Sequence, residues 1–237
     1  MIMKQISLVA LFTLSFIVLK AQYFVPELSS DQINRGKEAY AVTNAGDTVS
    51  GRVTTVMLAM GQLRSFTIKK DDGSKAKFKS ADVKSLAIKP SKIANMESAM
   101  SVQSVMTASS INFDEVINRE WVYFEKALLP KKKDKPVMMQ LLNPGFDSKI
   151  KVYLNPNAKE TKGVSLGGIK VTGGDDKSYL VVFDGNKSVV YKKSKYKKEA
   201  LSQLYKDCSV FTENYAGEKF KWRYFAEHVF VYDQLCD

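Results

Sequence analysis

Short stretches of alternating apolar and polar residues, each ended by a turn-forming group, run through most of this chain. Residues 38–43 alternate in this way and end at Asn44-Ala45-Gly46-Asp47, residue types that tolerate the positive φ of a tight turn. Asp71-Asp72-Gly73 is a second strong hairpin signal between two such stretches. Because side chains alternate between the two faces of a strand, the pattern predicts successive antiparallel strands.

The predicted strands form two groups, one before and one after residues 91–111. Gly51 is a candidate for a β-bulge in the second strand, and Pro90 ends the first group. The lysine-rich residues 131–135 are predicted to form a loop in the second group. The predicted strands cover residues 38–43 and 48–60, the stretches containing Phe66 and Ile68, Ala76 and Phe78, and Val83, Leu86 and Ile88, and residues 120–129, 137–142, 150–154, 169–172, 179–183 and 189–191.

The end of the chain has helical spacing instead. Ser194 can cap a first helix, and a second begins at about Glu218. The apolar positions that recur at helical intervals are Tyr196, Ala200, Leu201, Leu204 and Tyr205 in the first helix, and Trp222, Phe225, Val229, Tyr232 and Cys236 in the second. The predicted fold class is therefore α+β: mostly antiparallel β, as a meander or partly closed barrel, with two C-terminal helices.

The domain organisation follows from these boundaries. We expect a signal peptide at residues 1–21, an N-terminal β module at 22–90, and an antiparallel meander at 112–193. A helical pair at 194–237 is expected to pack on the sheet. Residues 91–111, rich in Met and Ser, are predicted to be a helical connector lying on the β module; an adaptable binding surface built on its methionines is the alternative.

Residues 1–21 have the order of a secretory signal. Lys4 precedes an apolar run from Ile6 to Leu19, and Ala21 offers a small residue for cleavage. The run stops at Lys20, short of the roughly 20 apolar residues that span a bilayer. We predict export to the periplasm or outer membrane, or to the exterior, with no transmembrane segment in the mature chain. An uncleaved anchor or a buried helix is the alternative.

Positive charge dominates the composition. The chain has 36 Lys and Arg against 25 Asp and Glu, a net charge of +11, which removal of the signal lowers to about +9. Such a charge attracts anionic surfaces, so an anionic glycan, a lipid headgroup or an envelope protein is an expected partner, and nucleic acid is not. The densest cluster, predicted to bind an anionic partner or else to be a solvated face, is Lys192, Lys193, Lys195, Lys197 and Lys198.

The chain has two cysteines, Cys208 and Cys236. Two thiols do not make a zinc site, which needs four ligands. In an exported protein a disulfide between them is the expected state, with residues 207–217 folding back along the last helix so that the pair can meet. Two separate buried thiols are the alternative.

The sequence contains a possible catalytic motif, but the elements predicted on either side of it do not fit a catalytic site. Residues 163–167 fit the G-x-S-x-G pattern, with His228 downstream, but a polar segment precedes the pattern and a strand follows it, whereas a nucleophile elbow needs a strand and then a helix. Ser165 is therefore predicted to be a turn residue. His228, the only histidine, is predicted to be structural, at the edge of the core. No catalytic residue, cofactor or metal is predicted.

Residues 46–53, Gly-Asp-Thr-Val-Ser-Gly-Arg-Val, resemble an uncharacterised family of exported Bacteroidota proteins, Flavobacteria-like, with a GDTxxGxV hairpin after the signal peptide. Residues 82–86, 141–147 and 206–208 extend the resemblance. It implies a Gram-negative envelope or secreted location and no activity. The function expected is thus a non-catalytic envelope protein, a binding or structural module with a basic surface. A hydrolase acting on envelope or extracellular polymers is the alternative.

Overall fold

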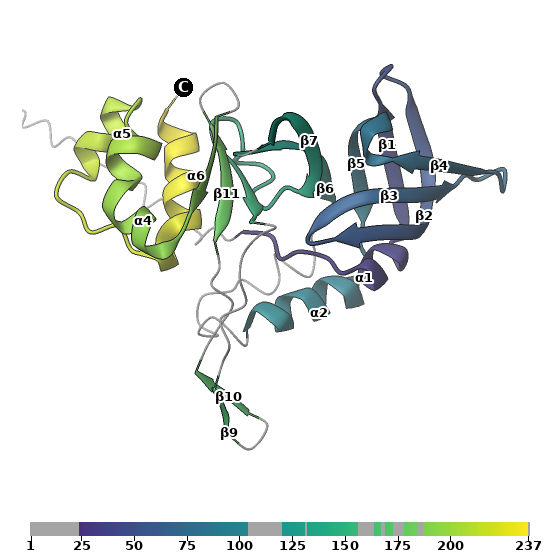
Figure 1. Ribbon diagram of the computed structural model, residues 1–237, viewed down its shortest axis with the longest axis horizontal. Coiled ribbons are helices and arrows are strands. Elements are labelled where there is room, and N and C mark those ends of the chain that lie inside the picture. Colours follow the sequence, from purple (N-terminus) through teal and green to yellow (C-terminus); the bar gives the residue numbers. More distant parts are fainter. Residues whose placement is uncertain are drawn as a thin grey trace, which may run out of the picture.

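The computed structural model describes residues 24–103, 120–130, 132–155, 164–166, 169–172, 178–183 and 187–236. The predicted signal peptide and the end of the predicted connector lie outside these ranges. The described elements form three layers, with a barrel at one end, a small sheet in the middle and the C-terminal helices at the other end (Figure 1).

Six antiparallel strands close the barrel in the order β2-β1-β5-β6-β7-β3, and β3 returns to pair with β2. β4 pairs with β3 outside this ring. The α+β class, mostly antiparallel with C-terminal helices, is confirmed. The bounds are β1 Glu38–Thr43, β2 Thr48–Ala59, β3 Gln62–Lys69, β4 Lys75–Lys79, β5 Val83–Lys89, β6 Val122–Leu129 and β7 Lys132–Gln140.

Two sequence predictions about these strands are corrected. The lysine run at 131–135 is not a loop from end to end, because β7 already begins at Lys132 and pairs there with Leu129. Gly51 is not an irregular position of β2, whose register with β3 shifts instead between Val53 and Thr55 and between Met57 and Leu58. Glycine is needed at position 51 for close approach: a Cβ there would lie 2.2 Å from the Lys69 carbonyl oxygen.

The barrel also joins the two predicted β groups. β6 and β7, which follow the connector, pair with β5 and β3, which precede it. The connector contains helix α2, Lys92–Gln103, as predicted, and packs against the short helix α1, Ser30–Asn34. Arg35, which caps α1, forms an ion pair with Glu97, and Gln32 donates to the Ala94 carbonyl.

The middle layer is a three-stranded antiparallel sheet in the order β12-β11-β8. Its strands are β8 Lys151–Leu154, β11 Tyr179–Phe183 and β12 Lys187–Tyr191. On β11, Leu180 and Val182 pack toward the barrel, while Val181 and Phe183 pack toward the helices. Burial on both faces explains why β11 is an uninterrupted apolar run. A separate hairpin pairs β9, Val164–Leu166, with β10, Ile169–Thr172.

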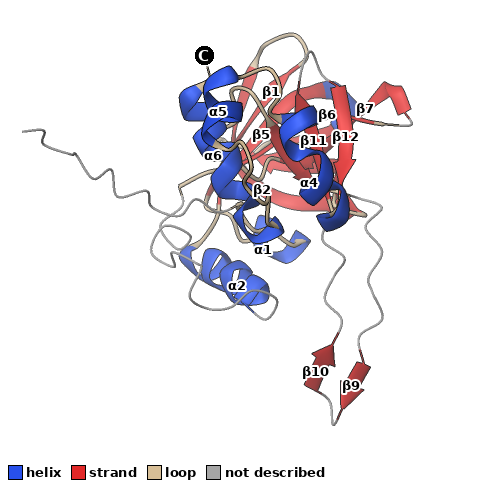
Figure 2. Cartoon of the chain, turned by 90° about the vertical axis from the view of Figure 1, so that its left-hand side faces the viewer, coloured by secondary structure: helices blue, strands red, loops and turns tan. Residues whose placement is uncertain are grey.

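The C-terminal helices cover the sheet, as the view from their side shows (Figure 2). Helix α4 begins after Lys192, not at a Ser194 cap, and α6 begins at Phe225, later than predicted. A further helix, α5, occupies part of the predicted loop. The bounds are α4 Lys193–Glu199, a π-helical turn Ala200–Leu204, α5 Ser209–Asn214, a 3-10 turn Trp222–Tyr224 and α6 Phe225–Leu235.

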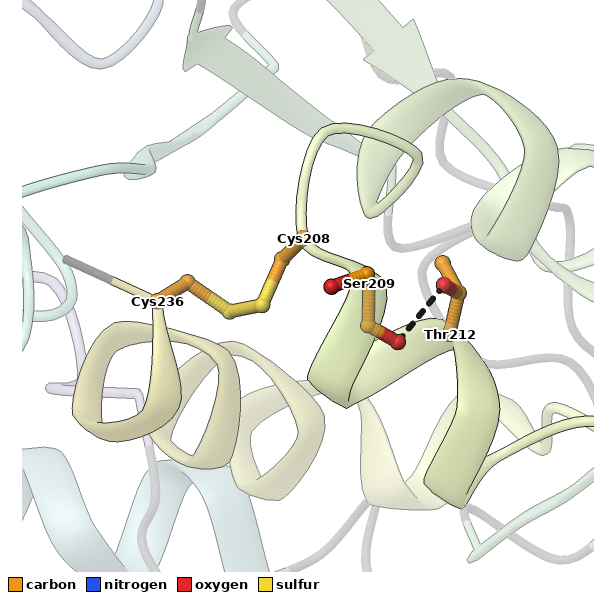
Figure 3. The surroundings of a disulfide bond; sticks show 4 residues. All are labelled: Cys208, Ser209, Thr212 and Cys236. Carbon is orange, nitrogen blue, oxygen red and sulfur yellow. Dashed lines mark hydrogen bonds between the residues drawn. A yellow bond between two sulfur atoms is a disulfide. The ribbon is translucent and has the colours of Figure 1, made fainter.

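The predicted disulfide is confirmed. Cys208, immediately before α5, is bonded to Cys236, immediately after α6, with the two Cα atoms 5.7 Å apart (Figure 3). The hydroxyl of Thr212 donates to the Ser209 carbonyl at the start of α5. The segment after Cys208 thus turns back beside α6 and brings the end of the chain into the helical layer.

The N-terminal segment crosses from the helical layer to the barrel. Phe24 contacts the rings of Tyr179 and Phe225. The residues that follow it lie beside the buried side chain of Gln140 in β7. Gln140 donates to the Pro26 carbonyl and accepts from the Leu28 amide. Among the described helices, none has the length and apolarity needed to cross a bilayer.

Candidate functional site

A buried chain of three polar side chains lies inside the helical layer. His228 of α6 is only 8% exposed, and its Nδ1 lies 2.6 Å from the hydroxyl of Tyr196 on α4. That hydroxyl is 3.1 Å from the hydroxyl of Tyr205. Burial lowers the pKa of His228 to about 4, and it raises the pKa of both tyrosines. All three groups are therefore neutral at neutral pH.

An open pocket lies beside His228. It has a volume of about 360 Å³ and lies between the end of α5 and the start of α6. Two rings of its wall, Tyr215 and Phe220, meet the imidazole at centroid distances of 5.3 and 4.8 Å. Its lining comprises Tyr215, Gly217, Glu218, Lys219, Phe220, Lys221, Tyr224 and His228.

Two cations lie beside Tyr224, one of the lining residues of this pocket. The Arg223 guanidinium lies 4.6 Å from the centroid of the Tyr224 ring, and the Lys221 ammonium lies 6.0 Å from it. Both distances fall within the range of cation–π attraction. The lining of the pocket itself has both charges, with Lys219 and Lys221 beside Glu218.

The geometry around His228 does not build a catalytic base. In a hydrolytic triad a carboxylate orients the histidine, whereas the partner here is the Tyr196 hydroxyl. A pKa of about 4 also makes the imidazole a weak base at neutral pH. The predicted position of His228 at the edge of the core agrees with its burial and its ring contacts.

Ser165 was predicted to be a turn residue, and this is corrected: it lies in strand β9, opposite Lys170 of β10. Residues 163, 167 and 168 lie outside the described part of the chain. A strand and no helix follows the motif, so the strand-to-helix context that a nucleophile elbow requires is missing.

The five predicted binding lysines are brought together at the start of α4. Lys192 precedes the helix, and the other four lie within it. Lys195 is partly covered, with its ammonium 5.2 Å from the Tyr191 ring and 3.9 Å from a Glu199 oxygen. It is the one lysine of the five with a carboxylate within 4 Å among the described residues. The remaining four are exposed.

A second basic surface, which sequence reasoning missed, lies on the barrel. We call it the basic barrel face, and it comprises Arg52, Lys69, Lys75, Lys77 and Lys79, all exposed. The register sets Arg52 opposite Lys69 and Lys69 opposite Lys75, which forms a row of three cations across β2, β3 and β4. The hairpin signal at residues 71–73, combined with the Lys-Ala-Lys-Phe-Lys alternation of β4, could have revealed the pair of Lys69 and Lys75 but not the position of Arg52.

Side chains that could bind a metal ion do not form a cluster among the described residues. Within the described ranges, no group of three or more His, Cys, Asp or Glu side chains lies close enough to hold a metal ion.

The chain was also compared with known proteins, and no family model, curated protein or solved structure matches it. The resemblance to exported Bacteroidota proteins therefore stays a prediction.

Proposed function

We propose that this chain is a non-catalytic, exported protein of the bacterial envelope that binds an anionic partner through the exposed lysines of α4. Three features support the proposal. The net charge is +11, the first residues have the order of a secretory signal, and the two cysteines form a bond that persists in oxidising compartments. The resemblance to envelope proteins points to the same location.

The observation that carries the proposal is the position of the lysines. Lys192 and Lys193 stand at the N-terminus of α4, and Lys195 follows in its first turn, where the helix dipole disfavours cations. Acidic side chains at these positions would stabilise the helix, yet its first turn contains none. A local arrangement that costs stability is expected where a surface serves binding. No feature of the described residues favours the hydrolase alternative.

The experiment measures retention of the mature protein on a heparin matrix, used as a general polyanion, over a gradient of NaCl. The test variant replaces four exposed lysines with Gln: Lys192, Lys193, Lys197 and Lys198. The matched control replaces four exposed lysines elsewhere: Lys37, Lys84, Lys92 and Lys149. Both variants lose the same net charge, so any difference between them reports on the α4 surface.

We expect the α4 variant to elute at clearly lower salt than the control variant. Equal elution of the two variants would contradict a role for the α4 lysines. Passage of the wild-type protein through the matrix at 150 mM NaCl would contradict anion binding altogether.

A further inference from the structure

The basic barrel face has a regular geometry that a point ligand does not require. Neighbouring strands lie about 4.8 Å apart, and side chains on one face recur about every 6.8 Å along a strand. The row formed by Arg52, Lys69 and Lys75 thus crosses three strands, while Lys77 and Lys79 continue the charge along β4. The cations therefore extend both across the strands and along β4. Such a surface suits an extended chain of anions.

The row also works against the stability of the sheet. Like charges directly opposite each other on antiparallel strands repel, and this row contains two such pairs, Arg52 with Lys69 and Lys69 with Lys75. No carboxylate lies within 4 Å of any of these three cations in the part of the chain that the structure describes. The nearby turn contains Asp71 and Asp72, and Asp72 accepts a hydrogen bond from the Ser74 amide.

The residues between the cations are hydroxyl side chains. Thr67 lies opposite Lys77, and Ser65 lies opposite Lys79. On β2, Thr55 lies opposite Thr67. Thr55, Thr67 and Lys77 therefore form a second row across the three strands, next to the row of cations. Hydroxyl groups both donate and accept hydrogen bonds, so they can pair with the hydroxyl and carboxylate groups of a sugar chain.

β4 makes this surface accessible. It pairs only with β3 and lies outside the closed ring. The hairpin formed by β3 and β4 projects at the end of the molecule opposite the C-terminal helices (Figure 1). The two basic surfaces therefore lie at opposite ends of the molecule and can be altered separately.

We propose that the basic barrel face binds an extended acidic polysaccharide, a polymer of uronate or sulfated sugars, with Lys69, Lys75 and Lys77 at its centre. A lipid surface fits less well, because bilayer insertion needs an apolar group among the cations, and only Met57, at the margin opposite Ser65, is one. This inference is independent of the α4 lysines.

The test titrates the mature protein with polygalacturonate at 150 mM NaCl by calorimetry. The barrel variant replaces Lys69, Lys75 and Lys77 with Gln. A control variant replaces three exposed lysines outside both surfaces, Lys37, Lys84 and Lys92, and a second barrel variant replaces the same three barrel lysines with Arg. Thermal unfolding of each variant checks folding; removal of like-charge pairs leaves the barrel variant at least as stable as the wild type.

We expect at least a tenfold loss of affinity in the Gln barrel variant, little change in the control, and retained binding in the Arg variant. Equal affinity of the Gln variant and the control would overturn the proposal. Tighter binding of the wild type to phosphatidylglycerol vesicles or to single-stranded DNA than to the polysaccharide would also overturn it. Loss of binding in the α4 variant alone would uphold the proposed function and refute this inference.

Discussion

Acid should destabilise this protein through a single imidazole. The pKa of His228 is about 4 in the folded chain and about 6.5 in an unfolded chain. The unfolded state therefore binds the proton first as the pH falls. The stability that comes from a neutral His228 is fully present above pH 6.5, and it is lost progressively between pH 6.5 and pH 4.

The size of the effect follows from the two pKa values. Between pH 7 and pH 5, the full difference lowers the free energy of unfolding by about 2 kcal/mol. Because His228 lines an open pocket, solvent screening reduces the expected loss to about 1 kcal/mol. His228 is the only histidine of the chain, so no other imidazole contributes to the slope in this range.

The assay is urea unfolding at pH 5, 6 and 7 for the wild type and for His228→Asn, whose amide keeps a polar group near the position of Nδ1 without titrating. The wild type should lose about 1 kcal/mol between pH 7 and pH 5, and the variant should lose much less. Parallel pH profiles for the two proteins would show that His228 does not cause the loss. A direct NMR titration that placed the pKa of His228 at 6 or above would show the same.

Three further outcomes are expected. Gly51→Ala should lower the free energy of unfolding by about 3 kcal/mol or more in urea unfolding, because its Cβ would meet a strand carbonyl at 2.2 Å; the open turn at Gly46 should lose only about 1 kcal/mol on the same change, and equal losses would contradict this. The bond between Cys208 and Cys236, 28 residues apart, should contribute about 3 kcal/mol, seen by comparing unfolding with and without reductant; two labelled thiols in unfolded, unreduced protein would contradict the bond. Mass spectrometry of the exported protein should find its N-terminus within a residue or two of Gln22, since this position follows the small residue Ala21, and an intact Met1 in the envelope fraction would contradict cleavage.

The strands could be predicted wherever a few neighbouring residues specify the turn between them. Residues 44–47 and 71–73 set the hairpins of β1 with β2 and of β3 with β4, and the predicted bounds of β1 agree with the structure. The closure of the barrel was not predictable in this way. It depends on pairing of β7 with β3 across more than 60 residues of chain, and no short pattern at Gln62 or Met139 specifies that register.

The candidate sites differ in the same respect: some depend on local sequence, and others depend on contacts between residues far apart in the chain. The disulfide followed from cysteine count and the expected compartment, and the α4 lysines were visible as a run of residues. The partner of His228 was not visible, because Tyr196 lies 32 positions away and only packing of α4 on α6 brings its hydroxyl to the imidazole. The basic barrel face went unnoticed because its cations come from three strands, and only the strand register sets Arg52 beside Lys69.

Anion binding without cleavage of the ligand can be tested in a single titration series. The mature protein is titrated with polygalacturonate by calorimetry from 50 to 300 mM NaCl, and each titrated sample is then analysed for shortened chains. We expect saturable binding that weakens steeply with salt, since exposed cations contribute the affinity, and a polymer of unchanged length. Binding that is absent at every salt concentration, or cleavage of the polymer, would contradict this expectation.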